Sequence, residues 1–271
     1  PNLIARAAEH PFLGEHLVMG TGVHSEIALA RFDGVELASA YEPIFDISVH
    51  ALAQSLTSGA EGVDRFGDEL GFQAVTQRLD GAAFDAFDPF DRIADDQQLV
   101  ALDRMSRALH AINFFGAQRR GLLFLRVHER LLKSVKYDHG RHFSSVLLSF
   151  GLNPSRVVIE LPAAAVAHKT FLGYLTTSYQ RYGFKVAGNL SNAGQILSVS
   201  ETARLDFIKM DAAIALRDAM VKPLVGYASR LRVPLIFNRV IDEPQFLALQ
   251  QYDVRFVQGP LFTAHYHDRA V

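Results

Sequence analysis

The feature that most constrains this sequence is a regular alternation of short apolar runs and helical stretches along its second half. Apolar runs of strand length occupy 121–127, 156–160, 184–188, 207–210, 233–237 and 254–257. Helical sequence fills the intervals, at about 129–150, 164–182, 193–203, 211–231 and 243–251. Short connections between such units imply right-handed crossovers and a parallel sheet. We therefore expect one α/β domain built as a (β/α)8 barrel, with a doubly wound open sheet as the structural alternative.

The first half adds a hairpin and a long helix. Asp33-Gly34 stands between apolar runs at 26–32 and 35–47, which predicts a β-hairpin that contributes the first strands. Apolar residues three and four apart then predict a helix, with Asp95 or Asp96 as its N-cap and Gly116 at its end. We expect 26–271 to form the barrel domain and 1–25 an N-terminal extension.

The stretch 59–96 differs from its surroundings in charge, with ten acidic residues and three basic ones. We expect a helix followed by a surface loop around Phe84, Phe87 and Phe90. An ordinary solvated acidic face accounts for this composition, while the three phenylalanines leave a partner-binding surface at 61–90 open.

Composition narrows the class of protein. The chain of 271 residues is 49% hydrophobic, enough for a large core, and its formal net charge of −2 argues against binding to nucleic acid or an anionic membrane. The sequence has no cysteine, so disulfides and thiolate metal sites are excluded. It also lacks the run of about 18 apolar residues that a membrane span needs. We expect a cytoplasmic protein.

Polar residues follow the predicted strands at the ends where barrels carry their chemistry. Six strand ends carry such residues: His128, Glu160, Asn189, Lys209 with Asp211, Asn238, and Gln258. Strand ends are also where polar sequence normally begins, so solvent exposure explains any one of them equally well.

Three motifs in the expected order carry a family resemblance. Tyr41-Glu-Pro-Ile is similar to Tyr-Gln-Pro-Ile, Ile208-Lys-Met-Asp211 to a Lys-Ile-Asp motif, and Gln258-Gly-Pro-Leu-Phe262 to Gln-Gly-Tyr-Leu-Phe. Together they resemble the EAL-domain family over about 41–262. Active members of that family hydrolyse cyclic di-GMP with two divalent metals, Mg²⁺ or Mn²⁺. The resemblance therefore implies an EAL-type barrel from bacterial cyclic di-GMP signalling.

The departures from the family pattern concern its acids. The Glu-Ala-Leu signature matches Gln54-Ser55-Leu56, a phosphate-contacting arginine falls on Ser58, and a strand-end asparagine falls on His128. Non-acidic residues stand where the resemblance leads us to expect metal-binding or neighbouring acids: Gln54, Asn189, Leu190, Asn238 and Ile241. Four residues of the family pattern are kept: Glu160, Lys209, Asp211 and Gln258.

These losses remove the charge that two divalent cations require, because Mg²⁺ and Mn²⁺ need anionic oxygen ligands. We expect no competent catalytic residue and no metal cofactor. His128 with Glu160 is a conceivable ligand pair for one transition metal, but a hydrogen-bonded histidine at the barrel mouth is the simpler interpretation. Lys209 either pairs with Glu160 or Asp211 or serves as the cation for a phosphate. The candidate ligand-binding residues are Gln54, His128, Glu160, Asn189, Lys209, Asp211, Asn238, Arg239 and Gln258.

Three functions follow from this pattern. The first is a catalytically inactive EAL-like regulatory domain that acts through a protein partner or a homodimer. The alternative is a receptor that binds cyclic di-GMP without hydrolysing it. An active phosphodiesterase, or another enzyme such as one acting on sugar phosphates, is the third, since barrels host many chemistries.

Overall fold

The computed structural model describes residues 3–11, 13–21, 26–48, 66–78, 93–134 and 138–267. Within these residues ten strands form one sheet. In chain order they are β1 (Leu17–Met19), β2 (Ala28–Phe32), β3 (Val35–Asp46), β4 (Asp68–Arg78), β5 (Leu122–Arg126), β6 (Val157–Leu161), β7 (Lys185–Leu190), β8 (Phe207–Asp211), β9 (Leu235–Asn238) and β10 (Phe256–Gln258).

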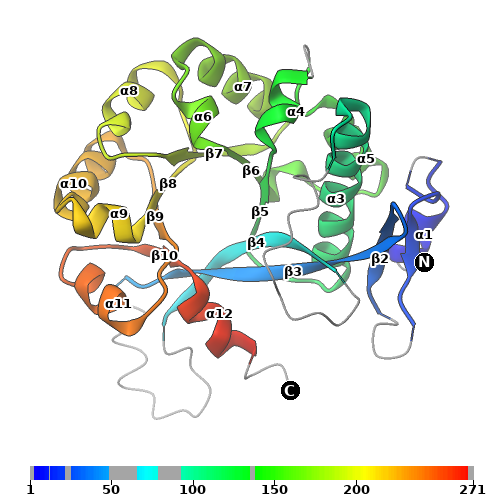
Figure 1. Ribbon diagram of the computed structural model, residues 1–271, viewed down its shortest axis with the longest axis horizontal. Helices are drawn as coiled ribbons and strands as arrows, with labels where there is room; N and C mark the ends of the chain where they lie inside the picture. Colours follow the sequence, from blue (N-terminus) through cyan, green and yellow to red (C-terminus); the bar gives the residue numbers. More distant parts are fainter. Residues whose placement is uncertain are drawn as a thin grey trace.

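The sheet closes into an eight-stranded barrel (Figure 1), which confirms the predicted architecture and rules out an open doubly wound sheet. Strands β4 to β10 pair with their neighbours in parallel, as expected. Strand β3 is the exception, because it pairs antiparallel with both β4 and β10 and so closes the barrel in the opposite direction. The parallel pairing predicted for the βα units is confirmed, and the antiparallel strand is the second strand of the predicted hairpin.

Most helices lie on the outside of the barrel (Figure 1). In the described residues they are α1 (Leu3–Ala8), α3 (Asp96–Gly116), α4 (Glu129–Ser134), α5 (Arg141–Ser149), α6 (Ala163–Val166), α7 (Lys169–Arg181), α8 (Gln195–Thr202), α9 (Ala212–Arg217), α10 (Val221–Leu231), α11 (Glu243–Gln250) and α12 (Pro260–His267). Three predicted helices are each split in two. Left-handed backbone contributes to two of the breaks, at Gly140 (φ 93°) before α5 and at Ala219 (φ 54°) between α9 and α10.

The hairpin and the long helix were predicted correctly. Asp33 (φ 49°) and Gly34 (φ 76°) both have positive φ, as a two-residue type I′ turn requires, and Phe32 pairs with Val35 across it. Asp95 caps α3 by accepting a hydrogen bond from the backbone N–H of Gln98 at 2.9 Å.

The helix expected within 59–96 was wrong where the structure describes this stretch, because 68–78 forms strand β4. This strand pairs with β3 along its length, from Arg78 opposite Leu37 to Asp68 opposite Asp46. Pairing with a long neighbouring strand outweighs local composition here. The predicted loop with Phe84, Phe87 and Phe90 lies outside the described residues.

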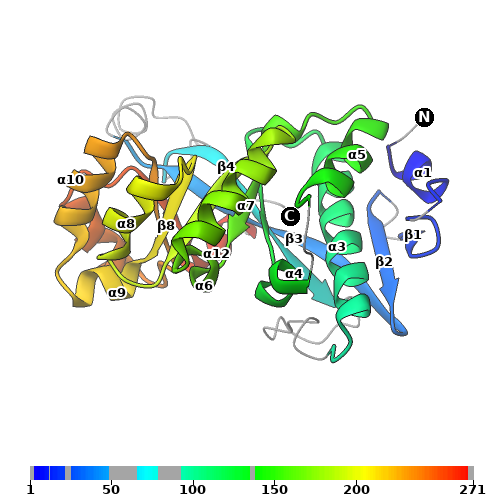
Figure 2. The same ribbon diagram turned by 90° about the horizontal axis from the view of Figure 1, so that it is seen from above.

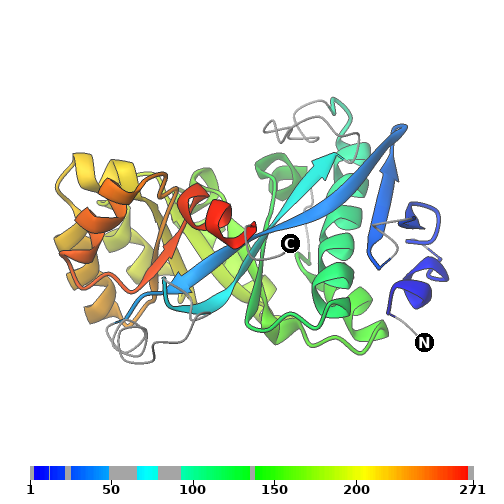
Figure 3. The ribbon, with the colours of Figure 1, turned by 90° about the horizontal axis from the view of Figure 1, so that it is seen from below.

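A smaller lobe stands beside the barrel, made from α1, β1, β2 and the outer half of β3, with α3 packed against it (Figures 2 and 3). It has an apolar core of its own, which includes Ile4, Leu17, Leu37, Leu102, Met105 and Phe150. The boundary predicted at residue 25 falls outside the described residues and stays a prediction. No helix of the described chain is long and apolar enough to cross a membrane.

Buried polar bonds tie α3 to this lobe. The Asn113 side chain accepts from the Ala28 N–H at 2.7 Å and donates to the Ala28 carbonyl at 2.9 Å. The His110 ring lies within hydrogen-bond distance of the Ser39 hydroxyl (2.7 Å) and the Thr76 hydroxyl (3.2 Å). Burial lowers the pKa of His110 to about 3, so this imidazole is neutral in the folded protein.

His110 makes stability depend on pH. The unfolded chain takes up a proton near the ordinary histidine pKa of about 6.5, whereas the folded protein does so only at about 3. Stability is therefore full above the unfolded pKa and falls as the pH drops towards the folded one. Between pH 6.5 and 5, urea titrations should show the wild type losing about 1.5 kcal/mol more than His110→Gln.

The exposed residue His168 supplies the control, since His168→Gln should follow the wild-type pH curve. If His110→Gln retained the full wild-type loss between pH 6.5 and 5, the neutral state assigned to His110 would be wrong.

Candidate functional site

The barrel interior is layered. One inward apolar residue from each of seven strands forms a closed cluster: Ile44, Phe124, Val158, Ala187, Phe207, Ile236 and Phe256. Side chains alternate along a strand, so the residues two positions nearer the carboxyl ends of the parallel strands also face inward. These inward residues, with Glu42 on the antiparallel β3 and Gln73 on β4, form what we call the polar layer: Glu42, Gln73, Arg126, Glu160, Asn189, Lys209, Asn238 and Gln258.

Lys209 lies at the centre of the polar layer and is completely buried, with 0% of its surface exposed. Its ammonium donates to Glu160 Oε2 at 2.7 Å, to Gln258 Oε1 at 2.9 Å and to Gln73 Oε1 at 3.0 Å. The ring of Phe124, in the apolar layer, has its centroid 4.8 Å from the same nitrogen. An ammonium has three N–H donors, so all three are satisfied.

Glu160 supplies the negative charge of this pair. Its second oxygen accepts from the Asn189 amide at 2.9 Å and lies 3.6 Å from Nε of Arg126. Burial alone would raise the pKa of Glu160, but the charges of Lys209 and Arg126 and these hydrogen bonds hold it below its ordinary value. Burial lowers the pKa of Lys209, against the opposing effect of the Glu160 carboxylate. The sequence left two partners open for Lys209, Glu160 and Asp211, and in the structure the partner is Glu160.

The rim above the polar layer carries a second, exposed pair. Asp211 accepts from the Ile214 N–H at 3.1 Å, capping α9, and lies 3.3 Å from Arg239, whose side chain is 73% exposed. Asn238 pairs with Asp211 in the sheet register and is half-buried. Arg239 itself has a left-handed backbone (φ 57°), which turns the chain away from the strand.

The other predicted residues are more scattered. His128 is half-buried, and its Nδ1 accepts from the Arg130 N–H at 3.2 Å, in keeping with a hydrogen-bonded histidine at the mouth. Leu190 is buried, whereas Ile241 is 58% exposed. Gln54 and Ser58 lie outside the described residues, so their assignment stays a prediction.

Sequence reasoning missed Gln73, Arg126 and Glu42. Gln73 went unnoticed because its strand was taken for a helix. In addition, the register slips between Ile44 and Phe45, where Leu70 has no partner, and this bulge changes the strand's alternation. One signal was available: Gln73-Ala74-Val75 is also similar to Glu-Ala-Leu, with an amide in place of the acid.

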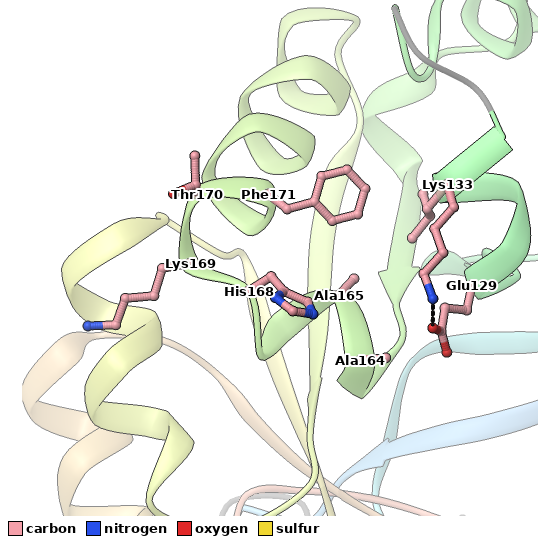
Figure 4. Close-up of a pocket in the computed structure, with 9 residues that line it drawn as sticks. Glu129, Lys133, Ala164, Ala165, His168, Lys169, Thr170 and Phe171 are labelled. Carbon is pink, nitrogen blue, oxygen red and sulfur yellow. Dashed lines mark hydrogen bonds and ion pairs between the residues drawn. The ribbon is translucent and has the colours of Figure 1, made fainter.

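Two surface grooves lie apart from the polar layer. The larger, of about 410 Å³, runs between α4 and the start of α7 (Figure 4); the Lys133–Glu129 pair lines its α4 side and His168 lines the other side. The other, of about 300 Å³, lies between α10 and the start of β9 and β10. None of the described residues predicted for the site lines either groove.

Several solved structures are similar to this chain in fold. A standalone EAL protein of Vibrio cholerae O395, solved in a cyclic di-GMP-bound form, matches with a TM-score of 0.64 at 15% identity, over 84% of this chain and 91% of its own. The chain has the EAL-domain fold. Klebsiella pneumoniae BlrP1, in a complex with manganese and cyclic di-GMP, matches at 0.65 and 19% identity over 93% of this chain.

A third match is Bacillus subtilis YkuI, a protein with an EAL domain solved with cyclic di-GMP and calcium, at a TM-score of 0.62 and 19% identity over 82% of this chain. The chain spans 61% of the BlrP1 chain and 54% of the YkuI chain. No protein-family model and no curated protein matches the sequence.

Residues of the polar layer do not fit the pair of divalent cations that the EAL resemblance implies. Each carboxylate here is held by the protein's own donors: Glu160 by Lys209, Glu42 by the Gln258 amide at 3.1 Å, and Asp211 by its helix cap and Arg239. Among the described residues, no three acids or histidines are grouped so as to hold a metal ion. Two hard cations need several anionic oxygens in one place, and this arrangement does not supply them.

The Lys209–Glu160 pair should dominate the stability of the barrel interior. Glu160→Gln leaves the Lys209 charge buried without an anion, which should lower the free energy of unfolding by about 3–5 kcal/mol. Adding Lys209→Met to that variant should restore much of the loss, because the double variant buries no charge. Urea unfolding followed by circular dichroism measures both effects.

The exposed Arg239–Asp211 pair is the matched control, and Arg239→Ala should cost no more than about 1 kcal/mol. Equal losses for Glu160→Gln and Arg239→Ala would contradict the central role of the buried pair.

Proposed function

We propose that this chain is an EAL-fold domain that does not hydrolyse cyclic di-GMP and acts as a regulatory module, through a partner protein or a second copy of itself. The observation that carries the proposal is the scarcity of acids in the polar layer, whose only carboxylates are Glu42 and Glu160, beside four neutral amides. Hydrolysis by two metals needs several anionic oxygens in one place, more than these two carboxylates supply.

Amides support the same conclusion. Gln73, Asn189 and Gln258 form hydrogen bonds with the pair, Asn238 belongs to the same layer, and all four carry oxygens without charge. They supply hydrogen bonds for a closed, neutral interior but no charge to activate a water molecule.

This proposal is tested by turnover. Purified protein, incubated with cyclic di-GMP and either Mg²⁺ or Mn²⁺, should yield no linear dinucleotide by chromatography, while an active phosphodiesterase in parallel does. Turnover that disappears in Glu160→Gln would overturn the proposal and assign catalysis to this layer.

A second candidate, a non-hydrolysing receptor for cyclic di-GMP, is favoured by two exposed cations at the barrel mouth. Arg126 and Arg239 are 60% and 73% exposed, and each lies at the carboxyl end of its strand. Guanidinium groups suit phosphate, because their N–H donors match its oxygens in pairs.

Titration calorimetry with cyclic di-GMP separates the two candidates. The receptor requires measurable binding that weakens about tenfold or more in Arg126→Ala, as expected for the loss of one charge-assisted contact. Arg255→Ala is the control, since Arg255 is 63% exposed and directly precedes β10, at the opposite end of the barrel. If no heat of binding is detected at tens of micromolar cyclic di-GMP, the receptor function is excluded.

A further inference from the structure

The larger surface groove, between α4 and the start of α7, has an apolar lining. Its volume is about 410 Å³. Leu132 of α4 and Ala165 of α6 are buried within the lining, and Phe171 of α7 is half-buried beside them. An apolar side chain that enters such a hollow removes its own surface and that of the lining from water, which is favourable. The groove is therefore suited to receive an apolar group.

The hollow follows from the sequence of α6. The two lining residues of this short helix, Ala164 and Ala165, have side chains of one carbon. Longer side chains from α4 and from the start of α7 stand on either side of them (Figure 4): Glu129, Lys133, His168 and Phe171. Ala164 is exposed, so a larger side chain at this position fills the groove without entering the core.

Charge around the groove favours an acidic ligand. Lys133 and Lys169 are positive, His168 becomes positive when it is protonated, and Glu129 is the only acid of the lining. Glu129 is already paired with Lys133. Helix α7 also begins here, and its N-cap His168 makes no side-chain hydrogen bond to the first turn. The partial positive charge of the first N–H groups of that helix adds to the charge of the lysines.

The rim of the groove is open to solvent. Ala164, His168, Lys169 and Thr170 are exposed, and the Lys133 side chain is 68% exposed. A small-molecule site encloses roughly 70–90% of its ligand, which an open groove does not do. A segment of a larger protein suits it better, because the surrounding surfaces of the two proteins add to the buried area.

We infer that this groove docks a partner protein through an acidic segment that carries an aromatic or large aliphatic side chain. The apolar side chain packs on Leu132, Ala165 and Phe171, while neighbouring carboxylates lie beside Lys169 and the start of α7. This inference rests on the proposed function and deepens it, since it names the surface through which the regulatory module binds its partner.

Selection from a library of random peptides displayed on phage tests the inference. Peptides that bind the wild-type chain should be enriched in aspartate or glutamate next to phenylalanine, tryptophan or leucine. Fluorescence polarisation with a labelled synthetic copy of an enriched peptide then measures affinity. Binding should weaken about tenfold or more in Ala164→Leu, which fills the groove, and in Lys169→Glu, which reverses a charge on its rim.

Both variants should fold, because position 164 is exposed and a glutamate in the first turn of α7 is favourable to the helix. Their Tm should stay within about 3 °C of the wild type. The matched controls are Ala167→Leu, at the exposed end of α6, and Lys222→Glu, at an exposed position of α10. Neither residue lines the groove, so both controls should bind the peptide as the wild type does.

Three results would overturn the inference: no enriched peptide, enrichment of basic peptides, or binding that survives both Ala164→Leu and Lys169→Glu. A dimer in analytical ultracentrifugation that Ala164→Leu dissociates would also overturn it, because a second copy would then fill the groove. The assays contain no cyclic di-GMP and no metal. Docking can therefore fail while the absence of hydrolysis holds, and hydrolysis can be found while docking holds.

Discussion

The buried contact between Lys209 and Glu160 is the interaction on which the upper half of the barrel depends. Below it the interior is closed by apolar side chains, but at the next level inward residues come from eight strands and most are polar. Polar groups so deep in a protein are tolerated only when they are hydrogen-bonded and their charges cancel. The ammonium meets this condition because it gives each of its donors to a different strand, β4, β6 and β10.

The strand pattern of the second half could be predicted because parallel barrel strands are buried on both faces and therefore stand out as apolar runs. For the same reason Glu160, Asn189, Lys209 and Gln258 could be grouped before their positions were known, since barrels place strand ends around one opening. The sequence pattern did not show how deeply each of these residues is buried. Lys209 is completely buried, whereas Arg239 is 73% exposed, although the sequence analysis grouped both around the same barrel mouth.

Strand β4 shows where sequence reasoning fails. Its acidic neighbours suggested a solvated helix, and the bulge at Leu70 interrupts the alternation that would have identified a strand. The consequence for the site was direct, because Gln73 lies on this strand. Arg126 was missed for a different reason. Charged residues at strand ends are common, and only its alternation with the buried Phe124 places it on the inner face.

Strand β3 has a consequence beyond closing the barrel. It is 12 residues long and serves two bodies at once: Ser39 contacts α3 in the smaller lobe, while Glu42 holds Gln258 inside the barrel. A strand cannot shift by one residue without turning every side chain to the opposite face. The register of β3 therefore fixes the lobe and the barrel relative to one another. An insertion or deletion of a single residue within β3 would keep only one of two contacts in place, either that of Ser39 with α3 or that of Glu42 with Gln258.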